Sequence, residues 1–386
     1  MNAHRLYQLE QLMLILFFCM SIYAPLFMGV IQEDKISSGI EKRNLANFPS
    51  LPKSFKSLSE YPEKFNIYYS DHFGFREVLT SIYFKLVNTR GNQSSVEDVT
   101  IGQDGWLFLG SIKPGYQGHD DPMGDAINVN LFTNKELKDF AKSIVAIKNW
   151  LSNKGIEYVY VIAPNKHTIY FEKLPQYISK KNNKSSTDQL VEYLQKHTHV
   201  AVVDLRPSLM MEKKYRQVYY KYDTHWNQYG ANVAQFEIMK TIKNFFPEKI
   251  KPFLLDNNQF KTVTRRVGDL AKFANINNIK EEMPQPVFEA GCTPVNEISD
   301  LKKMETHTMV CKTQQLNALI FRDSFFNALK PYISRHFNRS TYIWKRMNYS
   351  SLAKYVEQEK PDIVIDEVIE RSLPYTLSSA LFKNSQ

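Results

Sequence analysis

The sequence predicts an α/β fold in which helices cover both faces of a mainly parallel β-sheet. From about residue 135 onward, apolar β-rich runs alternate with helical stretches, which is the pattern of crossover units. The apolar runs are continuous, as expected of strands that are buried on both faces. The chain has 386 residues and is 43% hydrophobic, which is enough for one large domain with appendages.

The predicted elements follow one another in a regular order. Residues 99–110 predict a β-hairpin around a turn at Asp104–Gly105. Five further strands are expected over residues 156–163, 200–205, 316–321, 341–344 and 361–368. Helices are expected over residues 135–154, 187–196, 227–246 and 350–359, with a further helix beginning at Ser324. Residues 247–315 fit neither pattern and predict an irregular insertion near the functional site.

An uncharged apolar segment, Leu12–Ile31, precedes the body of the chain. It has the length of a membrane-spanning helix, although a cleaved signal peptide is the alternative. We expect an uncleaved single-pass anchor in the cytoplasmic membrane, with residues 1–11 as a cytoplasmic stub. The body then lies on the periplasmic or extracellular side. Residues 32–100 are expected to form an extension that packs on a catalytic domain at residues 101–386.

Charge and cysteine content narrow the class of protein further. The net charge of +9 comes from Lys and Arg residues that are spread along the chain. No basic-aromatic motif of a nucleic-acid module accompanies them, so we expect no nucleic-acid partner. An anionic glycan or a membrane surface is a secondary candidate. Cys292 and Cys311 are suited to form a disulfide in an oxidising compartment, and two buried free thiols are the alternative.

Polar side chains with catalytic potential lie at predicted strand ends and in a nearby loop. Ser324 follows the strand at 316–321, and sites of parallel sheets form at the carboxyl ends of strands. On local grounds alone, Ser324 is also a plain helix cap. Asp223 and His225, however, lie one residue apart in a loop before a helix. An imidazole activates a serine, and a carboxylate orients the imidazole, so the three residues predict a Ser–His–Asp site.

Other residues are weaker candidates for the same site. Asn165 and Lys166 follow the strand at 156–163. We expect the amide of Asn165 to donate to an oxyanion and Lys166 to bind an anionic sugar. The alternative is that both belong to a capped turn. His197 and His199 have no neighbouring Cys or acidic cluster. We therefore expect neither a metal nor a cofactor.

Several segments together resemble the alginate O-acetyltransferase AlgX/AlgJ-like family, a branch of the SGNH-hydrolase superfamily that is related to the DHHW proteins. They are NLANFP (44–49), DHFGFR (71–76), GQDGWLFLG (102–110), APNKHTIYFEKLP (163–175), YDTHWNQYGA (222–231), GDLAKF (268–273), FRDSF (321–325) and PDIVIDEVIER (361–371). The resemblance implies an SGNH-like sheet that is circularly permuted, because the D-x-H block here precedes the serine.

The resemblance also implies an activity and partners. Ser324 is the nucleophile of an O-acetyltransferase that modifies an exopolysaccharide, and a multipass membrane acyltransferase relays the acetyl donor. Arg322, near Ser324, replaces the small residue that is frequent in the family, and Arg346 and Trp226 are further candidates for binding substrate or oxyanion. A carbohydrate acetyl-esterase and a non-catalytic glycan-binding subunit of an export complex are the alternatives.

Overall fold

The computed structural model describes residues 3–31, 37–38, 43–44, 46–52, 54–75, 99–110, 121–266, 268–274, 276, 279–289, 291–297 and 306–376. Contacts divide the chain into two units: residues 1–96 with 271–277, and residues 97–270 with 278–386. Arg76, the last residue of the DHFGFR segment, lies outside the described residues.

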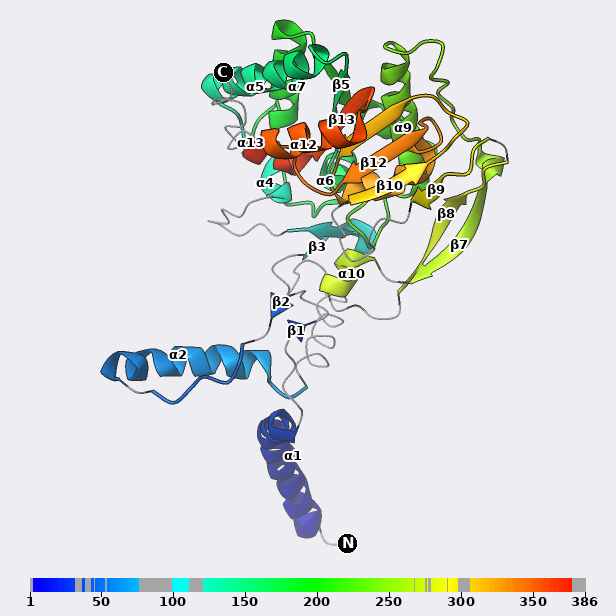
Figure 1. The fold of residues 1–386 in the computed structure, drawn as a ribbon. Coiled ribbons are helices and arrows are strands. Elements are labelled where there is room, and N and C mark those ends of the chain that lie inside the picture. The colour runs from blue at the N-terminus through cyan, green and yellow to red at the C-terminus, as the bar shows by residue number, and fades with distance from the viewer. Residues whose placement is uncertain are drawn as a thin grey trace. The chain divides into compact units, whose positions relative to one another are not determined.

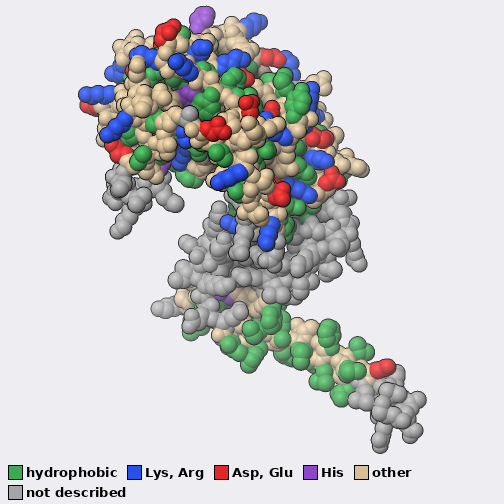
Figure 2. All heavy atoms as spheres, turned by 90° about the vertical axis from the view of Figure 1, so that its right-hand side faces the viewer, with side chains coloured by type: hydrophobic (Ala, Val, Ile, Leu, Met, Phe, Trp, Pro, Cys, Tyr) green, Lys and Arg blue, Asp and Glu red, His purple; other side chains and the backbone are tan. Residues whose placement is uncertain are grey.

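The first unit contains the apolar helix α1 (Ala3–Ile31), the short pair β1 (Ser37–Ser38) and β2 (Arg43–Asn44), and helix α2 (Phe55–Asp71). Within α1, the segment Glu10–Gly29 is long and apolar enough to cross a membrane. Figure 2 shows hydrophobic side chains along the outside of this helix. Ser54 caps α2 by accepting a hydrogen bond from the N–H of Ser57, which satisfies a donor that the helix itself leaves unpaired.

The second unit is built on a sheet of seven strands in the order β6-β5-β13-β11-β12-β10-β9 (Figure 1). Its strands are β5 (Glu157–Ala163), β6 (Ala201–Asp204), β9 (Val295–Glu297), β10 (Thr306–Val310), β11 (Asn317–Phe321), β12 (Arg339–Ile343) and β13 (Ile363–Ile369). The five strands from β6 to β12 in this order run parallel. The predicted α/β class with a parallel sheet is therefore confirmed.

Helices cover both faces of this sheet. One face packs against α8 (Arg206–Glu212), α9 (Gln228–Lys243) and α11 (Lys330–Ile333). The other face packs against α5 (Asn134–Ser152), α7 (Ser186–His197) and α12 (Tyr349–Glu359). Along β5, Val159 and Val161 belong to the first core and Tyr160 and Ile162 to the second. This alternation explains why the strand sequences are apolar without interruption.

Two expectations differ from the structure. Residues 247–315 contain the antiparallel pair β7 (Phe260–Arg266) and β8 (Lys280–Pro286) and helix α10 (Asp269–Phe273), and they supply β9 and β10, which extend the main sheet in the antiparallel sense. The stretch is thus more regular than expected. The helix that begins at Ser324 is a short 3-10 helix, η4 (Ser324–Ala328), and not an α-helix. Leu329 separates η4 from α11, and Pro331 lies in the first turn of α11, where its missing N–H costs no helical hydrogen bond.

Smaller elements complete the second unit. The hairpin of β3 (Val99–Ile101) and β4 (Leu107–Leu109) is antiparallel, as predicted. Cys292 and Cys311 form a disulfide with sulfur atoms 1.98 Å apart, which joins the segment before β9 to the end of β10. On the face drawn in Figure 2, basic and acidic side chains are interspersed and form no continuous basic patch among the described residues.

Candidate active site

Ser324, His225 and Asp223 form a chain of hydrogen bonds beyond the carboxyl end of β11. His225 Nδ1 lies 2.7 Å from Asp223 Oδ1, and His225 Nε2 lies 2.8 Å from Ser324 Oγ. Because a carboxylate only accepts, Nδ1 carries the proton of the neutral ring and Nε2 is left to accept from the serine. Asp223 is 2% exposed. This is the geometry in which a serine can be deprotonated as it attacks.

The D-x-H loop owes its shape to a tight pairing of its two ends. Tyr219 and Trp226 form an isolated antiparallel bridge, and the N–H of Tyr220 donates to the carbonyl of His225. The N–H of His225 also donates to Asp223 Oδ1 at 3.1 Å, so the carboxylate binds both the backbone and the ring. Asn227 then caps α9 by accepting from the N–H groups of the two residues that follow Gln228.

The backbone around Ser324 is held in place by the preceding residue, Asp323. Asp323 accepts from the N–H of Phe325 at 2.8 Å and from the N–H of Ile369 at 2.9 Å. It therefore caps the 3-10 turn and ties that turn to the end of β13. Burial raises the pKa of Glu367, with Asp323 as a second cause, and Glu367 Oε2 accepts from the N–H of Asp323. Asp323, the unusual residue before Ser324, thus stabilises the turn that carries Ser324.

A second carboxylate, Asp269, borders the same histidine. Its Oδ2 lies 3.6 Å from His225 Nδ1, its Oδ1 accepts from the N–H of Thr224 at 2.7 Å, and its own N–H donates to Asp223 Oδ2 at 3.3 Å. Burial, followed by the charge of Asp223, raises the pKa of Asp269. Sequence reasoning gave this residue no role, although it lies in the GDLAKF segment.

Asp223, His225 and Asp269 place one ligand atom each within 4.8 Å of one another, a spacing that would suit a metal ion. Both ring nitrogens of His225 are, however, already at hydrogen-bond distance from Asp223 and Ser324.

Comparison with known proteins identifies the family of the chain. The family described as "SGNH hydrolase-like domain, acetyltransferase AlgX" matches residues 99–320. The chain belongs to this family.

Among curated relatives of this AlgX-type chain, the probable alginate O-acetylase AlgJ of Pseudomonas syringae pv. tomato is 24% identical over 275 residues, which cover 69% of this chain and 63% of the relative. The AlgJ protein of Pseudomonas aeruginosa is 24% identical over 233 residues, which cover 58% and 52%. The chain therefore spans less than two thirds of the length of either relative.

Solved structures match the chain at lower sequence identity. PatB1 of Bacillus cereus matches with a TM-score of 0.49 and 16% identity, over 74% of this chain and 97% of that one. The O-acetyltransferase domain of Pseudomonas putida AlgJ matches with a TM-score of 0.44 and 17% identity, over 73% and 98%.

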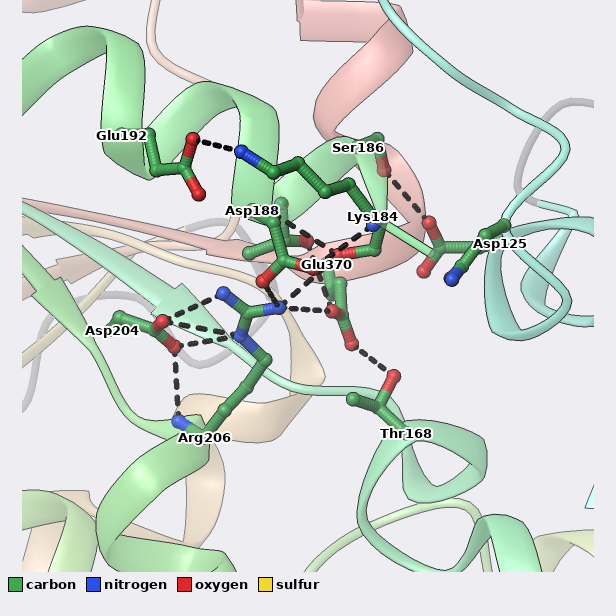
Figure 3. A network of polar contacts seen from close by, with 12 residues as sticks. Asp125, Thr168, Lys184, Ser186, Asp188, Glu192, Asp204, Arg206 and Glu370 are labelled. Carbon is green, nitrogen blue, oxygen red and sulfur yellow. Dashed lines mark hydrogen bonds and ion pairs between the residues drawn. The ribbon is translucent and has the colours of Figure 1, made fainter. Parts of the chain in front are cut away.

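The structure places two expected substrate residues of this AlgX-type chain in its interior. Asn165 is 1% exposed, and its Nδ2 donates to Asp125 Oδ2 at 2.7 Å. Asp125 belongs to the buried polar network around Glu370 that Figure 3 shows. The expected contact of Asn165 with an oxyanion is therefore corrected to a structural contact, since a polar residue after a strand can also point inward.

Lys166 is also a structural residue rather than an exposed sugar ligand. Its Nζ donates to the carbonyl oxygens of Leu107, Lys221 and Asp223 at 2.6, 2.9 and 3.1 Å. Burial lowers the pKa of Lys166 to about 7. Because two of the three acceptors belong to the segment that carries Asp223, Lys166 fixes the D-x-H loop to strand β4.

The structure places two further expected residues in different surroundings. Trp226 is fully buried, and its Nε1 donates to the carbonyl of Phe325 at 3.1 Å, so it supports the turn and does not face substrate. Arg346 is exposed, and its guanidinium donates to the carbonyl of Ser372. Arg371, which sequence reasoning left without a role, lies over the ring of Phe325 at 5.8 Å.

Proposed function

We propose that this chain is an O-acetyltransferase that transfers acetyl groups to hydroxyls of an extracytoplasmic polysaccharide through an acyl-enzyme on Ser324. The hydrogen-bonded chain from Ser324 through His225 to Asp223 carries the proposal, and membership of the AlgX-type family supports the acetyl group as cargo. The curated relatives are named for alginate, which makes an acidic polysaccharide our proposed acceptor.

The reaction would run in two half-reactions. In the first, His225 Nε2 takes the proton of Ser324 as Oγ attacks the acetyl carbonyl of the donor, and the imidazolium returns that proton to the leaving group. In the second, a sugar hydroxyl gives its proton to Nε2 and attacks the acetyl-serine ester, and Ser324 leaves with the proton. The N–H of Ser324 has no partner within its own turn, because the first N–H groups of a helix have none, and it is our candidate donor to the oxyanion.

The anchor and the donor complete the proposal. Helix α1 contains a segment suited to span a membrane, and we propose that it holds the catalytic unit on the periplasmic or extracellular side. A multipass membrane acyltransferase would relay the acetyl donor across the membrane, since acetyl donors are made in the cytoplasm.

A partition experiment tests this function. The full-length chain in detergent would be given a small chromogenic acetyl ester, with or without alginate oligosaccharide. We expect the acceptor to accelerate ester cleavage and to gain acetyl groups, measured by mass spectrometry. Release of acetate alone would favour the esterase, and no cleavage together with no labelling of Ser324 by a sulfonyl fluoride would favour a non-catalytic glycan-binding subunit.

A second prediction concerns the close packing of Gly268 against the D-x-H loop. A Cβ at Gly268 would lie 2.2 Å from the carbonyl oxygen of Tyr222 and 2.7 Å from Asp223 Cβ. Gly268→Ala must therefore displace the loop, and a shift of about 1 Å at a catalytic group lowers activity roughly 100-fold. The measurement is kcat/KM for the small ester, per folded molecule.

Gly155→Ala is the matched control. Gly155 has φ +71, and a Cβ added there would meet nothing within 4 Å, so alanine strains the backbone at this position without meeting the loop. We expect it to lower stability and to leave kcat/KM unchanged. Equal activity of the two variants would contradict the role of Gly268.

A further inference from the structure

Trp344 is an exposed aromatic residue at the carboxyl edge of the sheet, next to the strand that carries the nucleophile. It follows β12, and the residue is 45% exposed. Strands β11 and β12 are parallel with Phe321 opposite Ile343, and the N–H of Arg322 donates to the carbonyl of Ile343 at 3.0 Å. The residues that follow the two strands therefore lie side by side.

Arg322 connects the indole of Trp344 to the turn of Ser324. The guanidinium carbon of Arg322 lies 4.1 Å from the ring centroid of Trp344, which is a close cation–π contact. The same guanidinium donates through Nη1 to the carbonyl of Asp323 and to Asn327 Oδ1, both at 3.1 Å. Arg322 is itself 5% exposed, so the indole is held against a fixed cation and not against a mobile one.

This arrangement has the properties of a stacking platform. A large aromatic ring that keeps nearly half of its surface in water is poorly placed as a core residue, and ligand sites use such rings beside a few fixed polar groups. The apolar C–H face of a pyranose ring packs on an aromatic face, while its hydroxyls point outward at the rim. Lys345 and Arg346 follow Trp344 and are exposed, which suits a sugar that carries a carboxylate.

We propose that Trp344, supported by Arg322, is the platform on which a pyranose ring of the acceptor polysaccharide lies when a neighbouring hydroxyl reaches the acetyl-serine. This inference rests on the proposed function for the identity of the acceptor. It assigns Trp344 to the second half-reaction, in which a sugar hydroxyl competes with water for the acetyl group.

The first test measures binding and needs no turnover. Short acidic (alginate) and neutral (cellulose) oligosaccharides would be titrated calorimetrically into the full-length chain carrying Ser324→Ala, with and without Trp344→Ala. We expect at least one oligosaccharide to bind, and Trp344→Ala to weaken its binding about tenfold, the scale of one aromatic stacking contact. Trp344→Phe should restore part of the affinity. Equal affinity with and without the indole, or no binding by any oligosaccharide, would overturn the platform.

The second test measures how acetyl groups divide between sugar and water. With Ser324 intact, Trp344→Ala should lower the ratio of acetylated oligosaccharide to free acetate about tenfold at a subsaturating acceptor concentration. An unchanged ratio contradicts the platform while leaving the acyl-enzyme intact. Loss of ester cleavage in the unmodified chain would instead count against the proposed function, and the binding test would still decide the platform.

Trp150→Ala is the matched control for both tests. Trp150 also carries a cation over its ring, with Lys154 Nζ at 4.9 Å from the centroid. It lies at the end of α5, which leads into the amino end of β5, and so at the opposite edge of the sheet from Ser324. We expect its removal to change neither the affinity for the oligosaccharide nor the transfer ratio.

Discussion

Ser324→Ala is expected to lower kcat for the small acetyl ester by about 10⁴-fold or more, because in the proposed mechanism Ser324 alone forms the acyl-enzyme. His225 would keep its bond to Asp223, which the serine does not provide. The fold should therefore remain intact, and the loss should appear as activity and not as stability. Steady-state kinetics and thermal unfolding of the full-length chain in detergent measure the two.

The double variant Ser324→Ala, His225→Ala gives this prediction its sharper form. The effects of substituting residues that act as one catalytic unit do not add. The His225→Ala change should therefore lower kcat hardly at all beyond the loss caused by Ser324→Ala. Ser350→Ala, at an exposed position in the first turn of α12, is the control and should retain full activity. A Ser324→Ala variant with a tenth or more of the activity, roughly, would exclude the acyl-enzyme.

Arg206→Met is expected to destabilise the folded chain by about 3–5 kcal/mol, the usual cost of removing one partner from a buried ionic network. Arg206 donates to Asp204 at 2.8 Å and pairs with Asp188 at 2.8 Å, and it lies 3.9 Å from Glu370 (Figure 3). Glu370 is 1% exposed. Without the arginine, this carboxylate would be buried with hydroxyl and amide donors alone. Urea unfolding of the full-length chain, followed by circular dichroism, measures the loss.

Lys184→Met is the control within the same region. Lys184 pairs with Glu192 at 2.6 Å, but both side chains are more than half exposed, and such pairs contribute about 0–1 kcal/mol. A loss for Arg206→Met no larger than that for Lys184→Met would show that the network is as solvated as a surface pair.

The stability lost in Arg206→Met should depend on pH in a defined direction. Burial raises the pKa of Glu370, and Arg206 opposes that rise; burial also raises the pKa of Asp125 to about 8. A carboxyl group whose pKa is higher in the folded chain contributes stability at low pH and loses it as the pH rises through the folded value. The deficit of Arg206→Met should therefore be larger at pH 8 than at pH 5.

The sequence predicted the positions of Ser324, Asp223 and His225 better than the roles of the polar residues packed beneath them. The strand before Ser324 and the loop of Asp223 and His225 were visible, because apolar runs and the residues at their ends follow local rules. Lys166 and Asn165 also follow a strand, and the same rule predicted them as ligands. Only tertiary packing decides that Lys166 points inward onto three carbonyl groups.

Asp269 illustrates the opposite limit. Asp269 contacts His225 from a segment that follows helix α9 in the sequence, so no local sequence pattern relates the two residues. Its position depends on Gly268, which allows the backbone to pass close to Tyr222. Strand β10 was missed for a related reason: the segment Thr306–Val310 is partly polar, and only its pairing with β12 makes it a strand of the sheet.

The order of strands in the sheet has a consequence for how the protein matures. Strand β13 is the last in the sheet to be made, yet it lies in the middle of the sheet and pairs with both β5 and β11. A chain that emerges from its N-terminus onward therefore cannot join the half that carries the D-x-H loop to the half that carries Ser324 until Ile369 has been delivered. Each newly made molecule should thus bring Ser324 to His225 only in a single late step, after β13 has taken its place between β5 and β11.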